Sequence, residues 1–249
     1  MTDLIKQTLR RSLGLLGCES RRDAPSLSAL EVQRLLVERE SPMIFDVGAN
    51  VGTVTQDYRR LFPTAVIHAF EPFPESFAWL VQNTASDPNV FAHELAVSDH
   101  KGTCLLNSNA SAVTNSMLAT DPRGREAWGE GLLETAKQVE VQTTTIDSFC
   151  QENGISAVDI LKLDIQGAEL IALDGARDSL SRQAISLIYL EIILADTYRG
   201  QPKLHEYIQW LDSVSYRLFD FYNPVRSNLE LIQLDAIFLS STFREGLRR

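Results

Sequence analysis

Three apolar segments of this chain each end beside an acidic residue, and this repeated pattern limits the folds open to it. The segments and their acids are residues 44–52 with Asp46, residues 65–72 with Glu71, and residues 161–169 with Asp164. In an open α/β sheet, strands that deliver polar groups at their C-terminal ends line a ligand cleft. We therefore expect an α/β protein with a ligand site at that edge of its sheet.

Apolar stretches and helical patterns alternate from residue 43 onward, as in a sheet with helices on both faces. The expected strands cover residues 43–47, 65–70, 89–97, 139–144, 158–163, 185–193, 216–222 and 231–240. The expected helices cover residues 28–40, 74–84, 146–153 and 202–213, with others beginning near Thr53 and after Gly167. The nearly all-apolar stretch at 185–193 is typical of a central strand. The tail at 244–249 is expected to fray.

The chain divides into an N-terminal helical extension, residues 1–40, and one main domain, residues 41–243. We interpret residues 98–138 as a lid or acceptor-binding segment. Residues 98–131 are rich in Ser, Asn, Thr and Gly, and long irregular segments are usually functional or disordered. Residues 1–16 have the spacing of an amphipathic helix, which would rest on the domain, on a second copy in a homodimer, or on a membrane surface.

Charge and composition narrow the classes of partner. The 249 residues carry a formal net charge of -10, with 44% hydrophobic and 22% charged residues. Nucleic acid requires a basic footprint, so small molecules or neutral sugars are the favoured partners and no nucleic acid is expected. No apolar run reaches the roughly 20 residues of a membrane span. The three cysteines form no metal or redox pattern, and arginines interrupt the N-terminal apolar residues. We expect free thiols, no secretory signal and a cytoplasmic location.

The strand-end residues match the chemical groups of S-adenosylmethionine. Glu71 is placed to accept hydrogen bonds from a ribose diol, and Gly48 and Gly52 leave room for the methionine portion. Asp46 and Asp164 offer carboxylates to the ammonium and sulfonium cations. Each residue taken singly has a structural alternative, because glycines occur in ordinary turns and the N-terminus of a helix also attracts acids.

The spacing of the glycines favours S-adenosylmethionine over the main alternative cofactor, a nicotinamide dinucleotide. The dinucleotide fingerprint is G-x-G-x-x-G, whereas residues 48–52 read G-x-x-x-G. Asn50 stands where the second glycine would make room for pyrophosphate, and Asp46 would repel a diphosphate. Pro72 and residues 94–97, which include Ala96, are expected to flank the adenine of S-adenosylmethionine.

The chain resembles the FkbM family of S-adenosylmethionine-dependent methyltransferases over residues 43–222. The blocks that carry the resemblance are residues 45–52 (FDVGANVG), 69–72 (AFEP), 96–98 (AVS), 145–147 (TID) and 162–169 (KLDIQGAE). The resemblance implies a class I methyltransferase fold, with a seven-stranded, mostly parallel, Rossmann-like sheet and a reversed final strand. It also implies O-methylation of a sugar or natural-product hydroxyl. Asn50 of the first block is counted with the cofactor-binding residues. Gln166 stands where many relatives carry Glu, so no charged role is assigned to it.

Methyl transfer to an alcohol calls for a base that takes the hydroxyl proton, which contributes about 10²–10⁴-fold. Asp164 is the first candidate, as base or as part of cofactor binding. Glu191 is a lone acid in an apolar strand and needs either a task or a structural partner. His205 is the third candidate, with an exposed surface position as its alternative. Lys162 is expected to form a salt bridge.

The acceptor pocket is assigned from location in the chain. Asn115, Ser116 and Arg123 are expected to line it, with residues 198–202 as another wall. No cluster of metal ligands is close enough to assign a metal. Two other functions stay open, a methyltransferase for a protein or other acceptor, and a cofactor-binding module that acts as a scaffold without catalysis.

Overall fold

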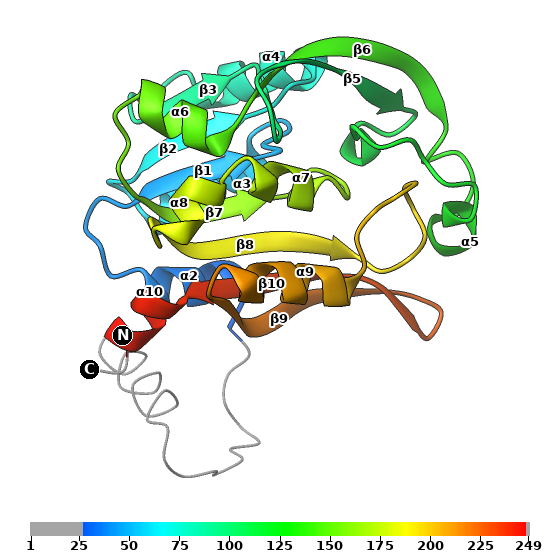
Figure 1. The fold of residues 1–249 in the computed structure, drawn as a ribbon. Helices are drawn as coiled ribbons and strands as arrows, with labels where there is room; N and C mark the ends of the chain where they lie inside the picture. Colours follow the sequence, from blue (N-terminus) through cyan, green and yellow to red (C-terminus); the bar gives the residue numbers. More distant parts are fainter. Residues whose placement is uncertain (1–26, 248–249) are drawn as a thin grey trace.

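The computed structural model describes residues 27–247, and its centre is a seven-stranded sheet covered by helices on both faces (Figure 1). The amphipathic helix expected at residues 1–16 lies outside the described residues. In the described part of the chain no helix has the length and apolar character that crossing a membrane requires.

The seven strands run in the order β3-β2-β1-β7-β8-β10-β9. They are β1 Met43–Val47, β2 Val66–Phe70, β3 Val90–His93, β7 Val158–Leu163, β8 Ile185–Ile193, β9 Tyr216–Ser227 and β10 Glu230–Ser240. Strand β10 pairs antiparallel with both β8 and β9, whereas the pairs from β3 to β8 are all parallel. The expected mostly parallel sheet with a reversed final strand is confirmed.

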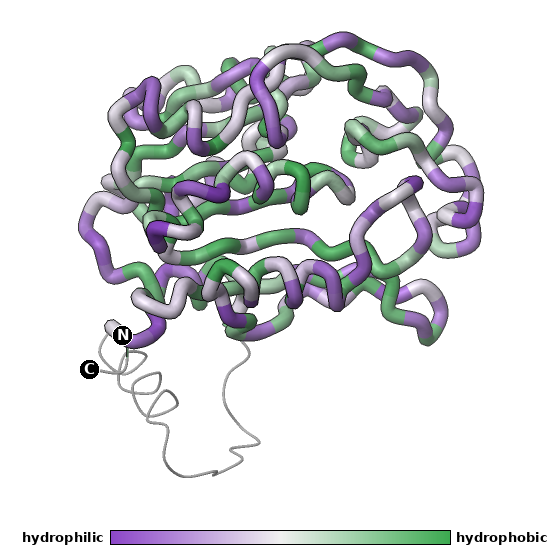
Figure 2. The backbone as a smooth tube through the Cα atoms, in the orientation of Figure 1, coloured by the Kyte–Doolittle hydropathy of each residue, from purple (hydrophilic) through white to green (hydrophobic). Residues whose placement is uncertain are grey.

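Two apolar clusters hold the helices on opposite faces of the sheet. The helices are α2 Ala29–Leu36, α3 Thr53–Leu61, α4 Pro74–Thr84, α6 Ile146–Glu152, α7 Glu169–Asp174, α8 Arg177–Ser181, α9 Leu204–Ser213 and α10 Ser241–Gly246. Helices α2, α3 and α10 pack in one cluster, and α6 to α9 pack in the other. Strands β7 and β8 are buried between the clusters and are mostly hydrophobic along their length (Figure 2).

Local signals explain most of the helix boundaries. Ser28 and Glu31 form a capping box at the start of α2, and the Thr145 side chain caps α6 as its position suggests. Helix α2 ends at Leu36, earlier than the predicted residue 40, because Val37 adopts an extended conformation. The expected fraying from residue 244 is wrong over α10, whose partly buried Phe243 packs in the same apolar cluster as α2 and α3.

The predictions for residues 89–144 need the largest correction. The single strand expected at 89–97 is two strands, β3 and β4 Ala96–Val97, which belong to different sheets. The segment expected to be irregular contains β5 Gly102–Asn109, and β6 begins at Thr135. Strands β4, β6 and β5 form a separate three-stranded sheet. Much of the β5–β6 ribbon is exposed, so its polar composition imitates that of a loop.

An arm leaves this second sheet between β5 and β6 (Figure 1). It carries the 3₁₀ helix η1 Ala112–Thr114 and the short helix α5 Gly124–Trp128. Single β-bridges join Asn107 to Ser116 and Thr120 to Tyr198. The arm is therefore tied to its own sheet and to the segment that follows β8. We call residues 110–134 the arm below.

A cluster of aromatic rings packs between β2, β3 and α6. His68 Nδ1 lies 2.9 Å from His93 Nε2, so that one imidazole donates and the other accepts. Phe45, Phe70 and Phe149 surround this pair of neutral rings. Burial, together with the neighbouring His93, lowers the pKa of His68 to about 4, and burial lowers the pKa of His93.

We predict that this pair makes the protein sensitive to acid. The unfolded chain binds protons on both histidines below pH 6.5, whereas the folded His68 does so only near pH 4. Stability should therefore fall as the pH drops through this window, with a slope of up to about 1.4 kcal/mol per pH unit for each histidine. Urea unfolding over a pH series measures the slope. The double variant His68→Phe/His93→Phe should flatten it and the exposed His205→Gln should not; an unchanged slope in the double variant would contradict the prediction.

Candidate functional site

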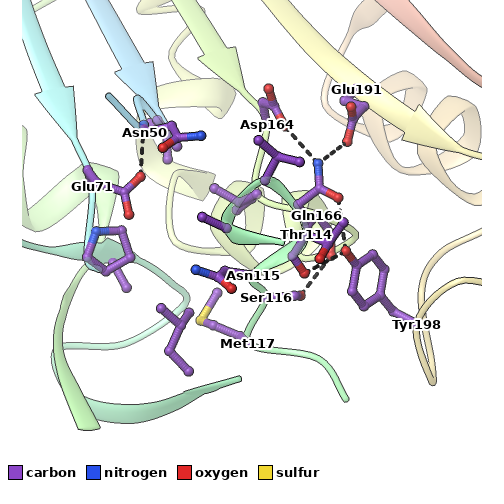
Figure 3. Close-up of a pocket in the computed structure, with 18 of the residues that line it drawn as sticks. Asn50, Glu71, Thr114, Asn115, Ser116, Met117, Asp164, Gln166, Glu191 and Tyr198 are labelled. Atoms are coloured by element: carbon purple, nitrogen blue, oxygen red, sulfur yellow. Dashed lines mark hydrogen bonds between the residues drawn. The ribbon is translucent and has the colours of Figure 1, made fainter. Parts of the chain in front are cut away.

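A cavity of about 410 Å³ opens at the C-terminal ends of β1, β2, β7 and β8 (Figure 3). We call it the strand-end cavity. It lies within the size range of small-molecule sites. One part is formed by the strand ends and the turn after β1, with Gly48, Asn50, Glu71, Pro72 and Ala96 among its lining residues. The other part is formed by the arm, the end of β8 and residues 197–198.

The turn after β1 brings backbone close to the end of β7, and only glycine fits there. Gly48 has φ +76°, and a Cβ atom on it would lie 1.9 Å from the carbonyl oxygen of Asp164. Gly48 is therefore required by its packing against the end of β7, and the approach of its backbone to the methionine portion of the cofactor stays a prediction. Gly52 has φ +90° and starts α3, but it packs against Leu80 and is not among the residues that line the cavity.

Glu71 is fixed at the end of β2 with its carboxylate facing the cavity. The backbone N–H of Asn50 donates to Oε2 at 2.8 Å, and the backbone N–H of Phe73 donates to Oε1 at 2.9 Å. Burial raises the pKa of Glu71 despite these two donors. A carboxylate held in this way keeps lone pairs free on both oxygens, as a pair of ribose hydroxyls requires.

Asp46 does not reach the cavity, which corrects its predicted contact with the cofactor. It is fully buried in β1; its Oδ1 lies 3.0 Å from Lys162 Nζ, and its Oδ2 accepts a hydrogen bond from Thr55 Oγ1 at 2.6 Å. Lys162 Nζ also donates to the carbonyl oxygen of Gly48 at 2.9 Å. Burial alone would lower the pKa of Lys162, but the carboxylates of Asp46 and Asp164 outweigh it and raise that pKa. The Asp46–Lys162 pair therefore holds the turn after β1 in place through the carbonyl oxygen of Gly48. The expected salt bridge of Lys162 is confirmed.

Asp164 and Glu191 face the cavity and are bridged by one amide. Gln166 Nε2 donates to Asp164 Oδ1 at 3.1 Å and to Glu191 Oε2 at 2.7 Å (Figure 3). Gln233 Nε2 donates to the other oxygen of Glu191 at 2.6 Å. Burial and the nearby charge of Asp164 raise the pKa of Glu191 well above that of an ordinary glutamate. The partner expected for Glu191 is therefore this pair of amides.

Hydrogen bonds tie the arm to the turn after β7. Tyr198 OH lies 2.9 Å from both Gln166 Oε1 and the carbonyl oxygen of Thr114. Ser116 Oγ donates to the backbone oxygen of Gln166 at 2.8 Å. Ser116, Asn115 and Tyr198 all line the cavity. That this part of it binds the acceptor stays a prediction.

Glu169 has a supporting position behind this turn. Its Oε1 accepts the backbone N–H groups of Ile165 and Gly167 at 3.1 Å, and its Oε2 accepts a hydrogen bond from Tyr207 OH at 2.7 Å. Burial raises the pKa of Glu169 to about 7. Since all its contacts are internal and it does not line the cavity, Glu169 shapes the loop that carries Gln166.

Two candidate residues lie away from the cavity. His205 is exposed on α9 and is not a lining residue, so it is not placed to act as the base. Arg123 is exposed and pairs with Asp121 and Asp196, instead of lining the acceptor pocket. Among the described residues, no three His, Cys, Asp or Glu side chains are grouped to hold a metal ion.

Sequence reasoning missed Gln233 and the apolar part of the arm. Gln233 interrupts the apolar residues of β10, and a polar residue in such a strand was the available signal. Trp128, Leu132 and Leu133 line the cavity from the arm. No periodic pattern marks them, because the arm contains only short helices.

Comparison with known proteins identifies relatives of the chain. The family model for the methyltransferase FkbM domain matches residues 46–218. The chain is 28% identical to the 2-O-methyltransferase NoeI of Sinorhizobium fredii, over 75% of this chain and 79% of that protein. It is 26% identical to the 31-O-demethyl-FK506 methyltransferase FkbM of Streptomyces tacrolimicus, over 80% and 81%. An rRNA methylase structure from Streptococcus thermophilus shares the fold, with 9% identity, a TM-score of 0.50, and 88% and 99% coverage.

We predict that Gly48→Ala damages both stability and the cavity. The added methyl group would meet the Asp164 backbone, which cannot move aside without shifting β7, so we expect a loss of about 2–4 kcal/mol in unfolding free energy. Gly154→Ala is a matched control, because Gly154 also has positive φ but a Cβ atom added there would meet no other atom within 4 Å. It should lose only about 1–2 kcal/mol. Chemical denaturation measures both, and equal losses would contradict the prediction.

We also predict that Lys162→Met costs about 3–5 kcal/mol, because it leaves Asp46 buried without its cation. The exposed pair of Lys101 with Glu152 supplies the control, since Lys101→Met should change stability by less than about 1 kcal/mol. The double variant Asp46→Asn/Lys162→Met should recover part of the loss. Thermal and denaturant unfolding provide the comparison, and a Lys162→Met variant as stable as Lys101→Met would refute a supporting role.

Proposed function

The chain belongs to the FkbM methyltransferase family, and from this premise we propose that it methylates a hydroxyl group of a sugar or secondary-metabolite acceptor. It is an S-adenosylmethionine-dependent methyltransferase of the class I fold. Both relatives described above are named for methylation at oxygen. The observation that carries the proposal is the strand-end cavity, in which a carboxylate suited to a ribose lies across from a second group of acids.

The cavity has the residues to hold the cofactor. S-adenosylmethionine supplies a methyl group made electrophilic by its sulfonium. Glu71 would bind the ribose hydroxyls, since its carboxylate is already oriented by two backbone donors. Pro72 and Ala96 line the cavity near Glu71 and would contact the adenine, and Asp164 would face the cationic groups. The turn at Gly48 lets the backbone approach the methionine portion.

Glu191 is our proposed general base. It lines the cavity, and its raised pKa makes it a stronger base than an ordinary carboxylate. Gln166 and Gln233 orient its two oxygens. The hydroxyl proton would pass to Glu191 while the acceptor oxygen takes the methyl group, which the cofactor would supply by cleavage of its carbon–sulfur bond. The rest of the rate acceleration would come from holding the acceptor oxygen in line with that bond.

We propose that the segment at 98–138, which includes the arm, supplies the wall against which the acceptor binds. Ser116 and Tyr198 connect this wall to the turn that carries Gln166. The acceptor and the proposed base would then be positioned by one continuous network. A module without catalysis would have no need to keep Glu191 facing the cavity with both oxygens oriented.

We predict that Glu71→Ala raises the dissociation constant of S-adenosylmethionine and of S-adenosylhomocysteine about 10–100-fold. Loss of hydrogen bonds to a charged group is worth about 1.5–3 kcal/mol, which corresponds to this range. Glu75→Ala is the control, because Glu75 is exposed on α4 and does not line the cavity. Calorimetric titration measures both variants. Unchanged affinity in Glu71→Ala would remove Glu71 from the cofactor site.

We predict that Glu191→Gln lowers the rate of methyl transfer about 10²–10⁴-fold and changes cofactor affinity less than about threefold. The wild-type rate should rise with pH as Glu191 loses its proton, and the variant should lack this rise. Glu230→Gln, an exposed change on the neighbouring strand, should behave as wild type. Formation of S-adenosylhomocysteine with a panel of hydroxylated glycosides and macrolides measures the rate. Cofactor binding without transfer to any of these acceptors would contradict the proposed function.

A further inference from the structure

The charges that line the strand-end cavity all have one sign. Glu71, Asp164 and Glu191 are its acidic residues, and no Lys, Arg or His occurs among its lining residues, all of which belong to the described part of the chain. The side chain of Asp164 is 38% exposed, so its charge faces the open space. More acids lie directly behind, since Glu169 and Asp235 act electrostatically on Glu191.

The cations near the cavity do not line it. Lys162 is buried behind the lining, where its Nζ lies 3.0 Å from Asp46 and 3.6 Å from Asp164, so it offsets part of the charge of one lining acid. Arg123 and Lys203 both pair with Asp196 on the outer surface. Neither lines the cavity. An anionic acceptor group inside would therefore meet acidic side chains and no cationic side chain of the lining.

The rim of the cavity is apolar. Val113 and Leu132 line the cavity from the arm, and they are 61% and 42% exposed. Met117, Leu133 and Trp128 continue this surface inward. Exposed apolar side chains that rim a pocket commonly mark the position of an apolar ligand surface.

We propose that the strand-end cavity selects acceptors that carry no negative charge near the reacting hydroxyl and that present an apolar face to Val113 and Leu132. This inference rests on the proposed function and narrows it. Uronic acids, phosphorylated sugars and nucleic acids are rejected by the acids of the cavity. Uncharged glycosides and macrocycles with a hydrophobic body are accepted, because they bury apolar area on the arm while a hydroxyl reaches Glu191.

Two matched dyes test the charge selection without a known acceptor. N-phenyl-1-naphthylamine is uncharged, and 1-anilinonaphthalene-8-sulfonate has the same rings with a sulfonate. We expect the full chain loaded with S-adenosylhomocysteine to bind the neutral dye at least tenfold more tightly. Val113→Glu should abolish the fluorescence of dye bound in the cavity. Binding in the cavity is therefore measured as the difference in fluorescence between the wild type and this variant. Leu229→Glu, a change at a residue that is 92% exposed and does not line the cavity, should leave it intact.

A charge variant separates electrostatic selection from fit. Ser111→Lys adds a cation to the lining and should tighten binding of the sulfonate dye several-fold, while Ser111→Gln should not. Equal affinity of the wild type for both dyes, no response to Ser111→Lys, or fluorescence that Val113→Glu does not reduce would each overturn the inference.

Methyl transfer to a neutral and to a charged glycoside then tests the charge selection separately from the proposed function. Octyl glucoside and octyl glucuronide differ only at C6, which carries a hydroxymethyl group in the first and a carboxylate in the second, and transfer to a ring hydroxyl of the glucoside alone supports the inference. Equal transfer to both, or transfer to the glucuronide alone, overturns the inference and leaves O-methylation standing. The protein could also discriminate between the dyes but transfer no methyl group to these glycosides or to the wider panel of acceptors. In that case the proposed function fails and the charge selection stands.

Discussion

The buried ion pair between Asp46 and Lys162 is the constraint on which the arrangement of the cavity depends. The two residues are partners in register on adjacent parallel strands, β1 and β7. Removing two charges from water is costly, and good geometry with further hydrogen bonds is needed to offset that cost. Thr55 and the carbonyl oxygen of Gly48 supply those bonds. The turn at Gly48 packs against the backbone of Asp164. The Asp46–Lys162 pair therefore fixes both the turn after β1 and the end of β7, which form the base of the cavity.

Gln166 has a comparable place at the other end of the cavity. It adopts φ +57°, which few residues other than glycine tolerate, and its amide and backbone contact Asp164 in its own turn and three other segments, at Ser116, Glu191 and Tyr198. A glutamate here would be a third acid beside Asp164 and Glu191 and would lack the N–H groups that join them. The amide therefore allows two carboxylates to lie close together while Tyr198 is held against the arm.

Much of the main sheet and of the cofactor half of the cavity was predictable, because strand-end acids and glycine turns are local patterns. The failures have physical causes. Asp46 is the penultimate residue of β1 and its side chain is buried in the core, whereas Asp164 is the first residue beyond β7 and faces the cavity. A difference of two positions in register therefore separates a buried acid from a lining acid. The β5–β6 ribbon was missed because a half-exposed antiparallel sheet carries polar residues at many positions. The apolar lining residues of the arm, Trp128, Leu132 and Leu133, could not be predicted, since the arm reaches Gln166 and Tyr198 only through long-range contacts.

The division into two sheets has a consequence for how such an enzyme evolves. The strands of the second sheet are hydrogen-bonded to one another and not to the strands that carry the cofactor turn. Substitutions, insertions or deletions in the arm can therefore accumulate without disturbing the register of the main sheet. Changes confined to the arm could then let the enzyme use new acceptors, while the residues proposed to bind the cofactor stay under separate selection.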